Sequence, residues 1–217
     1  MHLHKDLPIE QIKQTINEFT GKINQLPPRK SAVKRQIRQR EIYYFEVLEF
    51  DGRDILFKIG CQAGTYIRKI CSDFGQRLNI GAHMAELIRT KAGPFKIENS
   101  FTLHDLNDAY TLYKQEKNEK ELRKIVLPIE SAVEHMNKIW VFDGAVNNLC
   151  HGSDLYSPGV VKLHKNIQTN ELVAVMTLKD ELICLGITEI DSDRILEKDK
   201  GLVVKTKKVF MDRNLYN

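Results

Sequence analysis

The sequence predicts an α+β protein of two domains, with a boundary near residue 137. Helical periodicity and β-rich runs are mixed over residues 1–137, whereas from Lys138 onward five short apolar runs follow with one clear helical insert. Short strands at that spacing are typical of a small closed or nearly closed β-barrel. A chain of 217 residues is long enough to bury a core in one or two domains.

Helices are predicted where apolar residues recur at intervals of three and four. The pattern holds over 8–20, 64–79 and 102–117, and the last of these segments opens with a Thr-x-x-Asp capping box. Gly21 ends the first of these segments, as glycine often does at the end of a helix.

Strands are predicted from β-rich runs bounded by turn residues. The runs 43–50 and 54–61 flank Asp51-Gly52-Arg53, and Asp-Gly between such runs predicts a hairpin. The five runs that predict the strands of the barrel-like domain are 139–142, 159–164, 171–178, 182–190 and 202–211.

Positive charge is concentrated in one segment. The whole chain carries a formal charge of +4, but residues 29–40 contain six cations and no acid. This segment can be a solvated face or basic tail, or a surface that follows nucleic-acid phosphates. Pro27-Pro28 before it and apolar residues within it favour a fixed conformation and hence the second interpretation. The cations are Arg29, Lys30, Lys34, Arg35, Arg38 and Arg40.

Several classes of protein are disfavoured. No run of about 18 apolar residues indicates a membrane span, and the first residues, MHLHKD, lack the apolar segment of a secretory signal. Four dispersed cysteines without a Cys-x-x-Cys pair suit buried thiols in a reducing compartment, so a cytoplasmic protein is expected. The seven histidines are scattered, and no phosphate-binding glycine loop is present, so neither a metal nor a cofactor is expected.

Three segments together resemble a known family. They are 25–38 with Pro-Pro-x-x-Ser-Ala-x-Lys, 61–95 with Gly-Thr-Tyr-Ile-Arg, and 143–164 in the barrel-like tail. The chain resembles, nearly end to end, the TruB-type pseudouridine synthases. It is most similar to the archaeal and eukaryotic branch, the dyskerin-like catalytic subunit of box H/ACA ribonucleoproteins. The tail is similar to the RNA-binding PUA domain of that family. The resemblance implies a mixed-sheet catalytic domain over 1–137 and a PUA pseudo-barrel over 138–217.

The resemblance also implies roles for three residues in an active site. Tyr66 would stack on a flipped uracil and take part in proton movement at C5, and Arg68 would hold a catalytic carboxylate. Leu87 would form an apolar wall of the same pocket. Without the resemblance, a core aromatic and a surface cation are the better interpretations of Tyr66 and Arg68. The family has two arginines after the leucine, whereas this chain has Ile88-Arg89.

The nucleophile of the family is not in this sequence. That aspartate lies in a Gly-x-Leu-Asp-Pro motif, and none of the thirteen aspartates here is followed by proline. Asp73, the nearest after Tyr66, is expected to face solvent or cap a helix turn. We therefore expect an N-terminally truncated chain, from a split gene, a frameshift or a wrongly assigned start, which binds RNA but does not isomerise uridine alone.

The resemblance implies partners and leaves two alternatives. The expected partners are a guide RNA, substrate rRNA or tRNA, small H/ACA ribonucleoprotein subunits and a separate N-terminal half, in the cytoplasm or, in a eukaryote, the nucleolus. One alternative is a non-catalytic RNA-binding or assembly module, and the other is a stand-alone tRNA pseudouridine synthase.

A second RNA contact is implied in the tail, where single-stranded ends are the usual target. Glycines there would let the backbone approach bases closely, although each residue can equally be an ordinary turn residue. The implied contacts are His151, Gly152, Ser153, Asp154, Leu155, Pro158 and Gly159.

Overall fold

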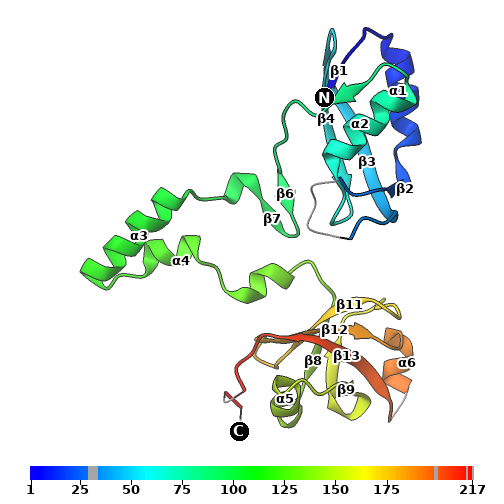
Figure 1. Ribbon diagram of the computed structural model, residues 1–217. Coiled ribbons are helices and arrows are strands. Elements are labelled where there is room, and N and C mark those ends of the chain that lie inside the picture. Colours follow the sequence, from blue (N-terminus) through cyan, green and yellow to red (C-terminus); the bar gives the residue numbers. More distant parts are fainter. Residues whose placement is uncertain (29–33, 198–199, 214, 217) are drawn as a thin grey trace. The chain divides into compact units, whose positions relative to one another are not determined.

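The computed structural model describes residues 1–28, 34–197, 200–213 and 215–216. The chain separates into two compact units, Met1–Ile88 and Arg89–Asn217, which are described in turn (Figure 1). None of the helices in the described residues is long and apolar enough to cross a membrane. The combination of helices and mixed sheets is the α+β class that the sequence predicts.

The first unit contains a five-stranded antiparallel sheet. The hairpin prediction is confirmed. Two long antiparallel strands pair with each other, and the pair at the turn is Asp51 with Asp54. Gly52 in the turn has a φ of 56°. The three shorter strands of the sheet have no counterpart among the predicted elements. In spatial order the strands are β2 (Gly21–Gln25), β3 (Arg38–Asp51), β4 (Asp54–Cys61), β1 (His2–Leu3) and β5 (Ala82–His83).

Two helices pack on one face of this sheet. They are α1 (Ile9–Glu18) and α2 (Ile67–Arg77), each one to three residues shorter at its ends than predicted. Their apolar sides join the inward residues of β3 and β4 in one buried cluster, which includes Ile12, Phe74 and Ile42. The core therefore holds the beginning of α2 against the sheet.

The second unit begins with a small hairpin and helices. The hairpin pairs β6 (Lys91–Ala92) with β7 (Phe95–Lys96), and short 3₁₀ turns lie at Ile97–Asn99 and Ile129–Val133. Between these turns are α3 (Leu103–Glu116) and α4 (Lys120–Ile125).

The predicted capping box of α3 is confirmed. The hydroxyl of Thr102 accepts the backbone N–H of Asp105 at 3.1 Å, and the Asp105 carboxylate accepts the Thr102 N–H at 2.7 Å.

The rest of the second unit is a six-stranded sheet with its own core. All five predicted strands are present, and β8 runs parallel to β11 while the other pairs are antiparallel. A two-residue strand and a last short helix are present in addition to the predicted elements. The order along the chain is β8 (Lys138–Val141), α5 (Asp143–Cys150), β9 (Leu155–Tyr156), the 3₁₀ turn Ser157–Gly159, β10 (Val160–Leu163), β11 (Leu172–Met176), β12 (Leu182–Thr188), α6 (Ser192–Glu197) and β13 (Leu202–Val209).

This sheet curls around a buried apolar cluster that includes Val146 and Leu149 of α5. Its spatial order is β10-β8-β11-β12-β13-β9, so β10 and β9 are its two edges in the described residues. The predicted nearly closed barrel is therefore present, with its opening between β9 and β10.

Candidate functional site

Tyr66 lies where the long hairpin ends and α2 begins. It is the N-cap residue of α2, half-buried, with an extended backbone (φ −98°, ψ 99°). The side-chain amide of Gln25, at the end of β2, makes two hydrogen bonds to it. The Gln25 Oε1 accepts the Tyr66 N–H at 3.0 Å, and the Gln25 Nε2 donates to the Tyr66 carbonyl at 3.2 Å. The backbone of this residue is thus tied to the sheet.

The loop before Tyr66 is held by the basic strand. Gly64 has a φ of 80°, and a Cβ at that position would lie 3.3 Å from Nη2 of Arg40. The N–H of Gln62 donates to the carbonyl of Glu41 at 2.8 Å, and the Thr65 hydroxyl donates to the Gln62 carbonyl at 2.6 Å. The predicted basic segment and the tyrosine motif therefore meet in one place.

Two arginines of the basic segment occupy alternate positions of β3. Arg38 pairs with Gln25 across the strands, and Arg40 pairs with Ile23. The Nε atoms of both arginines are buried and have no hydrogen-bond partner among the described residues. Guanidinium groups in this state can bind a bidentate anion such as a phosphate.

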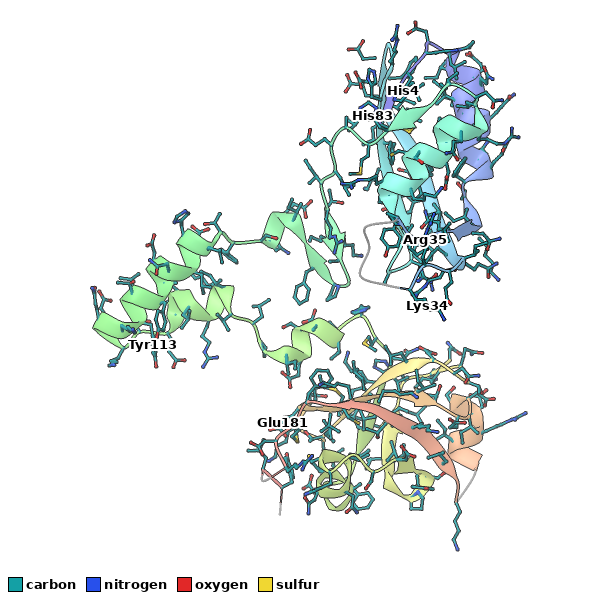
Figure 2. The ribbon with its side chains drawn as sticks, in the orientation of Figure 1. His4, Lys34, Arg35, His83, Tyr113 and Glu181 are labelled. Atoms are coloured by element: carbon teal, nitrogen blue, oxygen red, sulfur yellow. The ribbon has the colours of Figure 1, made fainter. Side chains whose placement is uncertain are left out.

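The remaining described cations of the segment are open to solvent. Lys34 and Arg35 are exposed just before β3, at the end of the unit away from His4 and His83 (Figure 2). Arg29 and Lys30 lie outside the described residues.

The other two predicted active-site residues lie on the surface of this unit. Arg68 is exposed in the first turn of α2, and Leu87 is 54% exposed in the segment after β5. Neither placement shows a formed pocket. The expectation for Asp73 was wrong, because its carboxylate is half-buried and pairs with Lys69 one turn earlier.

A second candidate surface follows α5. His151 ends this helix, and its Nδ1 lies 2.8 Å from the Asn147 carbonyl oxygen. Gly152 has a φ of 88°, and no described atom lies within 4 Å of where its Cβ would be. The exposed Ser153 continues this open turn. A base could approach the backbone closely here.

Three other members of the predicted tail site make contacts within the fold. Leu155 is 2% exposed in the core of the barrel, and a Cβ on Gly159 would lie 2.8 Å from its Cδ1. A larger residue at position 159 would therefore require the Leu155 side chain to shift. Pro158 is exposed. The carboxylate of Asp154 accepts the backbone N–H of Thr206 at 2.8 Å, so one of its oxygens is used internally.

The structure adds basic residues that the sequence analysis did not select. Lys205, Lys207 and Lys208 are exposed on β13, and Thr206 between them is bonded to the turn after α5. The signal in the sequence is the short run Lys-Thr-Lys-Lys, which lies within a run that predicts a strand. Beside it, a cavity of about 370 Å³ is lined by Cys150, His151, Gly152, Val209, Met211, Asp212 and Arg213.

Comparisons with known proteins identify both parts of the chain. The TruB family pseudouridylate synthase N-terminal domain matches residues 2–67, the tRNA pseudouridylate synthase B C-terminal domain matches 68–134, and the PUA domain matches 137–210. Proteins described as probable tRNA pseudouridine synthase B from Methanopyrus kandleri and Pyrococcus furiosus are 49% and 51% identical over 216 and 217 residues. Both alignments cover 100% of this chain and 64% of the relative.

Solved structures show the same relationship. A Cbf5-Nop10-Gar1 complex matches with a TM-score of 0.89 and 51% identity, over 99% of this chain and 66% of the other. An H/ACA RNP bound to a substrate RNA containing 2′-deoxyuridine matches with a TM-score of 0.84 and 48% identity, over 100% of this chain and 65% of the other. This chain thus spans about two thirds of these proteins. Since consecutive TruB matches are followed by a PUA match on the corresponding fold, the chain belongs to the TruB family of pseudouridine synthases that carry a PUA domain.

Proposed function

We propose that this chain is part of the catalytic subunit of an H/ACA ribonucleoprotein that converts uridine to pseudouridine in RNA. The observation that carries this proposal is the position of Tyr66, fixed at the start of α2 beside two arginines of β3. An aromatic residue whose loop contacts arginines that can bind a phosphate suits a nucleotide that has left its stack. The similarity to solved H/ACA complexes supports the choice of assembly.

The reaction requires the C1′–N1 glycosidic bond to break, the uracil to turn, and C5 to bond to C1′. The proton on C5 must then leave and N1 must take one up. In our proposal the ring of Tyr66 stacks on the uracil, and its phenol takes part in moving the C5 proton. Arg68 holds the catalytic carboxylate through a bidentate pair, and Leu87 covers the base. The exposure of both side chains leaves them accessible to such partners.

The catalytic carboxylate is proposed to come from another polypeptide segment. None of the thirteen aspartates of this sequence lies in a Gly-x-Leu-Asp-Pro motif. Asp73 is already paired with Lys69. In this proposal the residues of this chain bind RNA, and a segment that carries the Gly-x-Leu-Asp-Pro motif completes the site.

The tail is proposed to bind RNA as a PUA module over residues 138–217. Its contacts would be the open turn at His151, Gly152 and Ser153, the exposed Pro158, and the lysines of β13. The proposed partners are guide RNA, substrate rRNA or tRNA and the small proteins of the ribonucleoprotein, in the cytoplasm or, in a eukaryote, the nucleolus. Nop10 and Gar1 accompany Cbf5 in one matched complex, which supports the protein partners.

A stand-alone tRNA pseudouridine synthase is a second candidate, favoured by the description of the relatives as probable tRNA pseudouridine synthase B. The two functions differ in their need for a guide. In the first proposal the modification of a target uridine depends on an added guide RNA, whereas in the second the chain modifies tRNA without one.

Tritium release from RNA that contains [5-³H]uridine tests the proposal. We expect no release by the chain alone, and release when a polypeptide carrying the Gly-x-Leu-Asp-Pro motif of a relative is added. Release by the chain alone would contradict a carboxylate supplied in trans. RNA binding without release in the mixture would favour the non-catalytic RNA-binding module instead.

A further inference from the structure

Gln25 is a buried polar side chain whose two described hydrogen bonds converge on one residue. It is the last residue of β2 and only 2% exposed. Its amide oxygen accepts the Tyr66 N–H and its amide nitrogen donates to the Tyr66 carbonyl, at 3.0 and 3.2 Å. The two residues are 41 positions apart in the chain. The side-chain amide thus acts like one peptide group of an adjacent strand.

The contact with Gln25 holds the backbone N–H of Tyr66, a group that the hydrogen bonds of α2 do not hold. The described residues provide no side-chain cap at the N-terminus of α2, and the Tyr66 carbonyl also accepts the N–H groups of Lys69 and Ile70 at 3.0 and 3.1 Å. The Tyr66 N–H lies outside that helical pattern, and Gln25 is its partner. Without the amide, this N–H would lose its acceptor and the first turn could shift.

We propose that Gln25 is a positioning residue that sets the backbone of Tyr66 and so directs the tyrosine ring at the target uracil. The inference rests on the proposed function, because it assumes that Tyr66 meets the base. Gln25 pairs with Arg38 in the sheet, so it also ties the basic strand to the tyrosine. A flipped nucleotide held by the cations of β3 then meets a ring at a fixed position relative to them.

Photocrosslinking to RNA with a single 5-iodouridine in a loop tests this inference on the full chain. Irradiation joins uracil C5 to an aromatic ring in contact with it, with loss of HI, and mass spectrometry identifies the residue. We expect wild type to crosslink at Tyr66. In Gln25→Met the yield at Tyr66 should fall about tenfold, the order expected when two hydrogen bonds of a buried amide are lost together, while RNA affinity stays unchanged.

The variant Gln25→Glu tests whether the hydrogen bonds of residue 25, rather than the volume of its side chain, position Tyr66. At pH 8 the ionised carboxylate can accept the Tyr66 N–H but has no hydrogen to donate to the Tyr66 carbonyl. Protonation restores that donor, and burial favours the neutral form of a carboxyl group. The yield should therefore be low at pH 8 and recover towards pH 5, with a flat profile for wild type. Gln76→Met, at an exposed glutamine of α2, should behave as wild type.

The outcomes distinguish this inference from the proposed function. If wild type binds RNA but forms no crosslink at Tyr66, the placement of Tyr66 at the base is contradicted and the inference with it. If wild type crosslinks at Tyr66 and both Gln25 variants do so equally at every pH, Gln25 is not a positioning residue and the proposed role of Tyr66 stands.

Discussion

The carboxylate of Asp154 accepts the backbone N–H of Thr206 at 2.8 Å, which joins the turn after α5 to β13. The Thr206 hydroxyl donates to the Ser153 carbonyl at 2.8 Å, so two bonds hold the same turn. Asp154→Ala should lower the free energy of unfolding of the barrel by about 1–2 kcal/mol, as expected for a charge-assisted hydrogen bond that is partly exposed. Urea denaturation of the wild type and of the variant measures this decrease in the free energy of unfolding. Asp108→Ala, at an exposed carboxylate of α3, is the control, and an equal decrease there would refute the assignment.

The lysines of β13 should contribute to RNA binding. Lys205→Glu with Lys207→Glu is expected to weaken binding and to reduce the slope of log K against log salt by about one for each phosphate that the variant no longer neutralises. Filter binding measures the RNA affinity between roughly 50 and 300 mM salt, the range over which contacts between lysines and phosphates are screened. Lys165→Glu, exposed elsewhere in the same unit, should leave the slope closer to wild type. An equal change of slope for Lys165→Glu and for Lys205→Glu alone would mean that net charge alone matters.

The basic segment of the first unit should also contribute to RNA binding, independently of the lysines of β13. Charge reversal at Arg35 and Arg38 is expected to lower RNA affinity and flatten its salt dependence, because both lie at or just before the start of β3. Lys120→Glu on α4 is the control outside the segment, and it is compared with each arginine changed singly. An unchanged salt slope in the arginine variants would remove this segment from the interface.

Acid should loosen the start of α3. The Thr102 hydroxyl and N–H donate to the Asp105 carboxylate and hold its pKa below the usual value. A lowered folded-state pKa gives stabilisation that is present above the unfolded pKa and is lost as the pH falls through the folded value. The protection factors of the amides in the first turn, which correct for the pH dependence of intrinsic exchange, should therefore fall on acidification below about pH 4. Thr102→Ala should remove most of this acid response, whereas Asp108→Asn should retain it.

The four cysteines should differ in reactivity. Burial raises the pKa of the Cys71, Cys150 and Cys184 thiols, that of Cys184 to about 12, so little thiolate forms at pH 8. Cys61 is half-buried. Iodoacetamide should therefore label Cys61 first in the native chain and all four thiols in urea. Equally fast labelling of native Cys184 would contradict its burial.

The sequence determined the elements whose signals are local. Apolar spacing predicts α1, α2 and α3 to within three residues, and the Asp51-Gly52 turn predicts the hairpin, because these patterns act over a few neighbouring residues. The family resemblance likewise rests on short motifs, which is why Tyr66 and the basic segment could be selected. Two-residue strands such as β1 and β9 carry no such signal, since they exist only through their partners.

The tertiary structure decided which selected residues can reach a ligand. Leu155 and Gly159 belong to a turn whose sequence resembles a binding loop, but the Leu155 side chain is buried and fills the space beside Gly159. The contact of Gln25 with Tyr66 spans 41 positions, and that of Asp154 with Thr206 spans 52. Periodicity and motifs describe neighbours along the chain, whereas burial and long-range hydrogen bonds arise only when distant segments pack together.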